Sequence, residues 1–346
     1  MNHLPRSSGT LSSSSALGST VRLSALGQDL VIPCGLGIGC WSFGDDKHVW
    51  GWKSYDKSLT LESISAAFYA AVDGGVRFFD TAETYGGGLS EQIVGKLVGN
   101  HPLSDELMVA TKFQPGKWRG SGLGVRKAML AAAKESVKRL GIKQIALYQI
   151  HAPLFPASFE EQGHGLADVV EAGLAKAVGV SNFAMDELRP LHAALKSRGI
   201  PLASNQVEFS ILRQLPLTSG MLDECQKLGV KILAYSPLAM GRLTGKYSAK
   251  HEPEGRRGFS SYPMREIDPL VALMRDIGAR HQCTPGQVAL AWTIAKGAIP
   301  IPGAKNEAQA LENIAAHSIA CELSTDEIKQ LTEMGRDGKT SVWQHG

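Results

Sequence analysis

Four ionisable side chains lie at or just beyond the ends of three successive short apolar segments. Asp80, Lys112 and His151 each close one segment, and Tyr85 follows Asp80 by five residues. A nearby ammonium stabilises a tyrosine phenolate, a carboxylate keeps that lysine charged, and an imidazole can hydrogen-bond a carbonyl oxygen. Together these four residues predict a catalytic site that polarises and protonates a carbonyl group while the group receives hydride.

Strand-like and helix-like segments alternate from about residue 35 onward, as a barrel of parallel strands requires. The expected strands are short continuous apolar segments, typical of a parallel sheet that is buried on both faces. They cover 34–41, 76–79, 107–111, 145–150, 175–180, 203–207, 230–235 and 298–301. The expected helices cover 61–72, 91–98, 125–140, 159–172, 185–198, 218–228, 266–281, 285–296 and 307–317. This alternation predicts an α/β fold, a (β/α)8 TIM barrel, with its chemistry at the strand ends.

The rival architecture is a doubly wound sheet, which would place a GxGxxG turn after its first strand. The segment Gly35-Leu36-Gly37-Ile38-Gly39 lacks the third glycine at the required offset. We therefore favour the barrel, as a single domain over residues 28–346. The long connection from Met240 to about Tyr262 is too long for a passive turn and is a candidate lid.

Composition excludes several other classes of protein. A net charge of +3 over 346 residues gives no strong attraction to nucleic acid or to a membrane surface. No apolar segment is long enough to span a bilayer. The cysteines are scattered without zinc-like spacing, so we expect reduced thiols and no metal site; they are Cys34, Cys40, Cys225, Cys283 and Cys321.

The N-terminal segment differs from the rest of the chain. Residues 1–27 are rich in Ser, Gly and Leu, carry Arg6 and Arg22, and contain no acidic residue. Such a composition fits an organelle transit peptide, and it also fits a plain disordered tail. We expect a disordered leader over 1–27, with the plastid as the suspected location and the cytoplasm as the alternative.

The chain resembles the aldo-keto reductases over residues 30–335. The resemblance rests on the four ionisable residues and on further motifs in the expected order: Gly-Val-Ser-Asn-Phe (179–183), Asn-Gln-Val (205–207), Ala-Tyr-Ser-Pro-Leu (234–238), Leu-Thr-Gly-Lys-Tyr (243–247), and Ile-Pro-Gly-Ala-Lys (301–305) followed by Glu312-Asn313. Within the family the chain is most similar to plant and algal plastid members, including the pyridoxal reductase type.

This resemblance implies a nicotinamide cofactor held without a Rossmann motif. Ser181, Asn182 and Gln206 match the family's carboxamide ligands, and Tyr235 matches the aromatic residue that stacks on the nicotinamide. The remaining expected cofactor contacts are Trp41 and Asp80 near the reacting end, Ser236, Pro237, Leu238, Met240 and Lys246 along the pyrophosphate, and Gly303, Lys305, Gln309, Glu312 and Asn313 at the adenosine end.

Each of these residues also has a plainer interpretation. Ser181 and Asn182 could cap the following helix, and Tyr235 could belong to the core. Gln206 is harder to explain in that way, because a polar side chain within an apolar strand is costly unless it is paired. Lys305 favours NADPH over NADH, since the 2′-phosphate needs a cation.

Phosphate recognition departs from the usual pattern of the family. Many members carry Arg at the position of Gln309, or Ser at the position of Lys305. Arg256 and Arg257 in the candidate lid could add positive charge, or they could be ordinary surface residues.

An apolar substrate wall is expected from the large side chains that follow the early strands: Trp41, Phe43, Trp50, Trp52, Trp118, Leu154 and Phe155.

The expected function is NADPH-dependent reduction of an aldehyde or ketone, with Tyr85 as the proton donor. Pyridoxal and reactive aldehydes are candidate substrates. The alternative is a cofactor-binding regulatory subunit of the potassium-channel beta type with little turnover. We expect a monomer whose partner is a small carbonyl compound, with no nucleic acid and no membrane bound.

Overall fold

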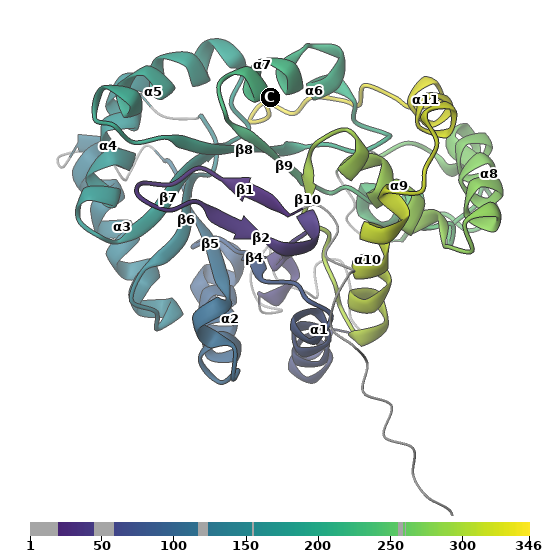
Figure 1. Ribbon diagram of the computed structural model, residues 1–346, viewed down its shortest axis with the longest axis horizontal. Coiled ribbons are helices and arrows are strands. Elements are labelled where there is room, and N and C mark those ends of the chain that lie inside the picture. Colours follow the sequence, from purple (N-terminus) through teal and green to yellow (C-terminus); the bar gives the residue numbers. More distant parts are fainter. Residues whose placement is uncertain (1–19, 45–58, 117–123, 154–155, 255–258, 260) are drawn as a thin grey trace, which may run out of the picture.

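The computed structural model describes residues 20–44, 59–116, 124–153, 156–254, 259 and 261–346. Eight parallel strands lie side by side in chain order (Figure 1). They are β3 (Ile38–Gly39), β4 (Phe78–Asp80), β5 (Met108–Phe113), β6 (Ile145–Ile150), β7 (Ala175–Ser181), β8 (Leu202–Glu208), β9 (Lys231–Tyr235) and β10 (Ile299–Pro300).

The first and last strands of this sheet meet, which closes the barrel. Gly39 pairs in parallel with Gly303, and the Gly37 N–H donates to the Pro300 carbonyl at 3.0 Å. The seam is tight, because a Cβ on Gly39 would lie 2.7 Å from the Ile301 carbonyl oxygen. The predicted (β/α)8 barrel is confirmed, and closure excludes the open doubly wound sheet.

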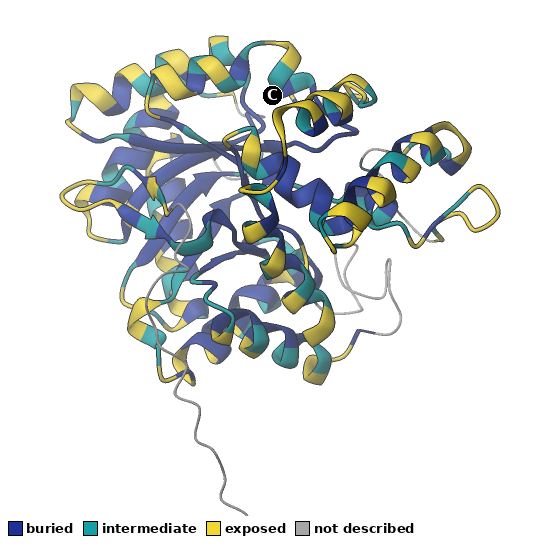
Figure 2. Ribbon diagram, turned by 45° about the vertical axis from the view of Figure 1, so that its right-hand side comes forward, coloured by how far each residue is buried: buried dark blue, intermediate teal, exposed yellow. Residues whose placement is uncertain are grey.

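Helices surround the barrel and turn their buried faces toward its strands (Figures 1 and 2). They are α1 (Leu61–Asp73), α2 (Leu89–Gly99), α3 (Gly124–Leu140), α4 (Phe159–Glu171), α5 (Met185–Ser197), α6 (Leu215–Thr218), α7 (Met221–Lys227), α8 (Met264–Arg280), α9 (Pro285–Ala295), α10 (Glu307–Ala320) and α11 (Thr325–Glu333). None of the helices in the described part of the chain has both the length and the apolarity that crossing a membrane requires.

Local sequence explains where several helices begin. Thr60 and Ser63 form a reciprocal capping box at the start of α1, and Thr284 and Gln287 do the same at α9. The sequence predicts a helix over 218–228, but α7 begins only at Met221, because Gly220 adopts φ 78° and separates α7 from α6, which ends at Thr218. A left-handed residue cannot continue a right-handed helix.

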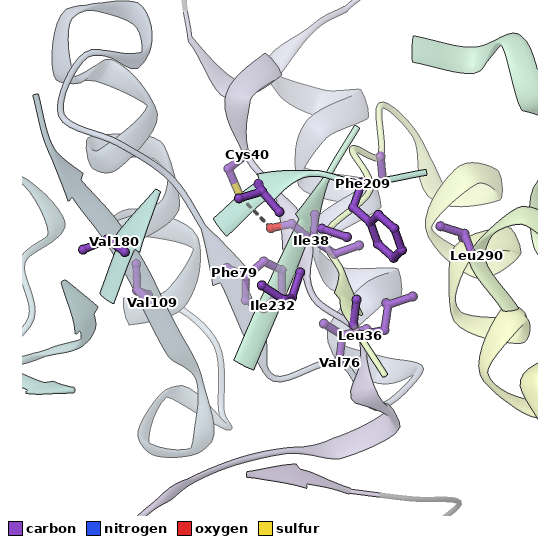
Figure 3. Close-up of a cluster of buried hydrophobic side chains, with 14 of the residues drawn as sticks. Leu36, Ile38, Cys40, Val76, Phe79, Val109, Val180, Phe209, Ile232 and Leu290 are labelled. Carbon is purple, nitrogen blue, oxygen red and sulfur yellow. Dashed lines mark hydrogen bonds between the residues drawn. The ribbon is translucent and has the colours of Figure 1, made fainter. Parts of the chain in front are cut away.

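Two apolar clusters hold the fold together. The larger lies mainly between strands and helices, and Figure 3 shows part of it, including Val76, Phe79 and Ile232. The smaller fills the inside of the barrel, where Leu23 packs with Phe78 and other inward-facing strand residues. Burial of this apolar surface is the main stabilising contribution to a barrel that is packed rather than hollow.

A two-stranded hairpin contributes to the smaller cluster and differs from the expected leader. Strand β1 (Val21–Leu23) pairs antiparallel with β2 (Leu30–Ile32), and Leu23 is fully buried. The fold therefore already includes Val21–Leu23, which the sequence assigned to a disordered leader over 1–27. Residues 1–19 of that segment lie outside the described residues.

Candidate active site

The carboxyl ends of the strands surround a cavity of about 740 Å³. Parallel strands that alternate with helices bring their carboxyl ends to the same face of the barrel, so residues distant in sequence meet there. Three of the four predicted catalytic residues, Asp80, Tyr85 and His151, line the cavity, while Lys112 lies behind them. All the predicted cofactor residues except Lys305 line it as well.

Lys112 is the centre of the predicted catalytic group. Its Nζ lies 2.5 Å from Asp80 Oδ2 and 2.8 Å from the Thr81 carbonyl oxygen, and it donates to the Tyr85 hydroxyl oxygen at 3.4 Å. The Lys112 side chain is fully buried and Asp80 is 3% exposed. Because Lys112 donates to the Tyr85 oxygen, the hydrogen of the Tyr85 hydroxyl remains available to an acceptor in the cavity.

Tyr85 and Lys112 each keep their own proton at neutral pH. Loss of solvation raises the pKa of Tyr85, and the Lys112 charge only partly offsets that effect. Burial works against the Lys112 charge, but Asp80 and Tyr85 outweigh it and raise the pKa of the ammonium. The sequence predicted that Lys112 would make Tyr85 more acidic; its influence has that sign, but desolvation dominates. At neutral pH, Tyr85 is therefore a neutral donor beside a charged lysine.

The loop that carries Tyr85 depends on three glycines in succession. Gly86, Gly87 and Gly88 have φ values of 58°, 64° and 96°, between the Tyr85 turn and helix α2. Other residues rarely adopt this left-handed region, so the triplet turns the chain sharply after Tyr85. The triplet therefore sets the direction of the backbone beside Tyr85.

His151 lies directly after β6, with its ring 5.6 Å from the Tyr85 ring in an edge-on arrangement. Burial and the Lys112 charge lower the pKa of His151 to about 3. The imidazole is therefore neutral at physiological pH and can donate one N–H to an oxygen in the cavity. Its buried Nδ1 has no hydrogen-bond partner among the described residues.

The next strand ends place amide, hydroxyl and aromatic groups beside these four residues. Ser181 donates its hydroxyl to the Gln206 carbonyl at 2.8 Å, and Asn182 donates its amide to the His151 carbonyl at 3.1 Å. The Tyr235 hydroxyl donates to Asn182 Oδ1 at 3.0 Å. Neither Ser181 nor Asn182 caps helix α5, whose N-cap is Ala184. The capping interpretation of Ser181 and Asn182 therefore fails.

The far end of the cavity is built from two segments, and the first of them has an unusual backbone. After β9, Ser236, Ala239 and Met240 have positive φ values of 50°, 48° and 52°. Beyond Gly303, helix α10 begins and presents Gln309 and Asn313 to the cavity. Lys305 differs from its expected place, since it does not line the cavity; its backbone N–H donates to Gln309 Oε1 at 3.0 Å. Arg256 and Arg257 lie outside the described residues.

The apolar wall is only partly the one expected. Trp41 lines the cavity, but Phe43 is fully buried in the core. The other expected wall residues, Trp50, Trp52, Trp118, Leu154 and Phe155, lie outside the described residues. Phe259 and Trp343 line the cavity instead, with ring centroids 5.8 Å apart. Phe259 belongs to the candidate lid, and the rest of that lid stays a prediction.

The C-terminal segment contributes residues that the sequence did not indicate. Gln344 is 1% exposed and donates to the Tyr235 hydroxyl at 2.7 Å and to Glu208 Oε2 at 2.6 Å. Trp343 stacks near Tyr235, with centroids 6.4 Å apart and planes 20° apart. No local pattern marks Gln344, because Tyr235 and Glu208 lie more than a hundred residues away in the sequence.

The described cavity suits a nicotinamide dinucleotide. Gln206 offers an amide and Tyr235 an aromatic ring close to Tyr85 and His151. Ala239, Met240 and Gly241 have successive positive φ values, and tight turns of this kind can direct backbone N–H groups at phosphate oxygens. The N-terminus of the 14-residue helix α10 favours negative charge as well. The volume of about 740 Å³ also lies within the usual range for ligand pockets.

Comparison with known proteins identifies the family. A model of the aldo/keto reductase family matches residues 35–336. The chain belongs to the aldo/keto reductase family. This aldo/keto reductase is 35% identical to the chloroplastic pyridoxal reductase of Arabidopsis thaliana, over 90% of this chain and 85% of that protein. It is 29% identical to the L-glyceraldehyde 3-phosphate reductase of Escherichia coli, over 85% and 89%.

Solved structures agree with this assignment. A thermostable aldo-keto reductase in complex with the inhibitor epalrestat gives a TM-score of 0.70 at 28% identity, covering 92% of this chain and all of that chain. The Bombyx mori aldo-keto reductase in complex with NADP gives 0.71 at 25% identity, covering 95% and 96%. As a family member, the chain is an NADPH-dependent oxidoreductase that acts on carbonyl compounds.

Proposed function

We propose that this aldo/keto reductase reduces an aldehyde to the alcohol with Tyr85 as the proton donor. One observation carries the proposal: buried Lys112 contacts the Asp80 carboxylate and the Tyr85 hydroxyl oxygen at once. That arrangement leaves the Tyr85 hydrogen free and places a cation where the phenolate charge develops. Bound NADPH supplies the hydride.

Each of the four residues then has a defined part in the reaction. Tyr85 gives its proton to the carbonyl oxygen, and the resulting phenolate is stabilised by the Lys112 ammonium. Asp80 keeps Lys112 charged and in place. Neutral His151 donates an N–H to the same carbonyl oxygen and fixes its approach. Tyr85 afterwards regains a proton from solvent through the open cavity.

The cofactor residues act as orienting groups in this proposal. Ser181, Asn182 and Gln206 would hold the carboxamide of the nicotinamide, and the Tyr235 ring would stack on the nicotinamide. Positive φ values after β9 support a pyrophosphate site there, with Lys246 lining the same cavity. Gly303, Gln309, Glu312 and Asn313 form the adenosine end. Lys305 belongs to this set only if its side chain turns toward the 2′-phosphate when the cofactor is bound.

The test is the variant Tyr85→Phe, which removes one hydroxyl and keeps the ring. The second-order rate constant for aldehyde reduction should fall at least about 100-fold, while the Kd for NADPH changes by less than about twofold. Tyr148→Phe is the matched control, because the Tyr148 hydroxyl contacts the Met129 carbonyl away from the cavity. Wild-type turnover by Tyr85→Phe would refute Tyr85 as the donor.

Pyridoxal is the substrate that we propose first. The relative from Arabidopsis thaliana carries that activity in its name, and aromatic rings from Trp41, Phe259 and Trp343 line the cavity where a planar ring could stack. NADPH oxidation should be compared with pyridoxal, an unsaturated lipid-derived aldehyde and a sugar-derived carbonyl. A rate constant for pyridoxal below both others would overturn this choice. Reactive aldehydes would then be the better class.

The regulatory-subunit alternative is not favoured, because the named relatives above are reductases.

We further propose that the protein is a monomer in the plastid. The chloroplastic relative supports the location, and the pairing of β1 with β2 supports a leader that ends before Val21. Residues 1–20 fused to a fluorescent protein should direct it to plastids in plant cells, and size-exclusion mass should equal that of one chain. Cytoplasmic fluorescence would refute the plastid location, and a larger mass would refute the monomer.

A further inference from the structure

A second glutamine, Gln149, lies beneath the predicted carboxamide site and has no role in the reaction described above. It stands two residues before His151 on β6, and its side chain is fully buried inside the barrel. A buried amide in an apolar strand costs free energy unless its polar atoms are paired. Gly179 on the neighbouring strand leaves the space, because a Cβ there would lie 3.2 Å from Gln149 Cγ.

Gln149, Asp80 and Gln206 form a closed triangle of hydrogen bonds. Gln149 Nε2 donates to Asp80 Oδ1 at 3.1 Å, and Gln206 Nε2 donates to the same oxygen at 2.8 Å. The third side joins Gln206 Nε2 to Gln149 Oε1 at 3.3 Å. The other carboxylate oxygen of Asp80 receives Lys112. The triangle thus joins the predicted proton-donating residues to the predicted cofactor-binding residues.

The chemistry of the groups fixes which way each amide points. A carboxylate only accepts hydrogen bonds, so both glutamines must turn their nitrogen toward Asp80. Gln149 then offers its oxygen to the second N–H of Gln206. Both N–H bonds of Gln206 are therefore used, and the Gln206 Oε1 receives no hydrogen bond from the described residues. Gln206 lines the cavity, so this oxygen is the atom it presents to a ligand.

We propose that Gln149 is a positioning residue, which holds the Gln206 amide so that Oε1 accepts a hydrogen bond from the carboxamide N–H of the cofactor. This inference rests on the proposed function, because it assumes that Gln206 binds the carboxamide. Without Gln149, one N–H of Gln206 loses its acceptor, and the bond to Asp80 is left as the only restraint on the amide from the described residues. The amide can then tilt about its last side-chain bond, so Oε1 is less firmly oriented toward the cavity.

The test compares NADPH with its 3-acetylpyridine analogue, which carries a methyl ketone instead of the carboxamide and so lacks the N–H donors. Wild-type protein should bind NADPH more tightly than the analogue. In Gln149→Leu, the Kd for NADPH should rise about tenfold, while the Kd for the analogue changes by less than about twofold. Both constants can be measured from quenching of tryptophan fluorescence, without turnover. Loss of selectivity is the signature that a purely structural role would not give.

Two further variants keep the result interpretable. Gln149→Met has an unbranched side chain of similar length and serves if Gln149→Leu does not fold. Gln162→Leu is the matched control, because Gln162 is 1% exposed and its amide donates to the Ala157 carbonyl at 3.1 Å, on the helical side of the barrel. Gln162→Leu should keep the wild-type selectivity between the two cofactors.

The outcomes separate this inference from the proposed function. If wild type selects NADPH and the Gln149 variants select it equally well, the positioning role is wrong and the proposed function stands. If wild type binds both cofactors equally, Gln206 is not the carboxamide ligand, and the inference falls together with that part of the cofactor site. The Tyr85→Phe experiment remains an independent test of the reaction in either case.

Discussion

Replacement of Asp80 by Asn isolates the buried ion pair on which the site depends. Asp80 and Lys112 are 3% and 0% exposed, and their charged atoms lie 2.5 Å apart. The two glutamine amides already turn their N–H groups toward the carboxylate. An asparagine must therefore direct its own NH2 either at Lys112 or at these two donors, so every orientation sets a donor against a donor.

The expected loss of stability follows from this geometry. Removing one partner of a buried ion pair costs about 3–5 kcal/mol, because the remaining charge is buried without compensation. Asp168→Asn is the matched control: Asp168 pairs with Arg126 and Arg198 at the surface, where its side chain is 21% exposed and Arg126 is 46% exposed. For that replacement we expect a loss of about 1 kcal/mol or less.

Guanidinium unfolding at neutral pH, followed by circular dichroism, measures both losses. Combining Asp80→Asn with Lys112→Met removes both charges and should restore part of the stability, since no uncompensated charge remains. If Asp80→Asn lowers the unfolding free energy no more than Asp168→Asn does, the Asp80–Lys112 pair does not behave as a buried ion pair. A double variant less stable than the single variant would contradict the same reasoning.

Two other predictions concern acid stability and packing. The pKa of His151 in the folded protein is about 3, below its unfolded value of 6.5, so the unfolded chain takes up the proton first and stability falls as pH drops below 6.5. Because the ring faces the cavity, we expect the unfolding free energy to fall by about 1 kcal/mol by about pH 5. This loss should be absent in His151→Gln when the unfolding free energy is measured against pH. Parallel curves for the wild type and His151→Gln would contradict the prediction. In helix α2, Gly95→Ala would place a Cβ 2.0 Å from the Leu140 carbonyl oxygen and should lower the unfolding free energy by about 2 kcal/mol or more. A Cβ on Gly99 has no atom of the described residues within 4 Å, so Gly99→Ala should stabilise the protein slightly. Equal melting temperatures of the two glycine variants would refute the packing argument.

Much of the barrel could be predicted from local pattern alone. Short apolar strands and amphipathic helices are set by neighbouring residues, so their order and approximate bounds are readable from the chain. The position of Asp80, Lys112 and His151 at successive strand ends is equally local. Parallel strands then force these ends together, which is why residue type and spacing were enough to predict that these side chains meet.

Other parts of the site depend on contacts that no local pattern reveals. Gln344 and Tyr235 are 109 residues apart in sequence, and Phe259 and Trp343 meet only in the folded protein. Gln149 carried a weak signal, since it is a polar residue within an apolar strand, as Gln206 is. The hairpin of β1 and β2 was missed because Val21–Leu23 is short and lies among Ser and Gly.

The sequence by itself determined which groups can exchange a proton here: a phenol, an ammonium, a carboxylate and an imidazole at the ends of adjoining strands. Only the tertiary structure decided their protonation states. The pKa of Tyr85 is raised although Lys112 is its neighbour, and the pKa of His151 is lowered to about 3. Both results depend on how much water the surrounding fold removes from each group, and that is a property of packing in three dimensions.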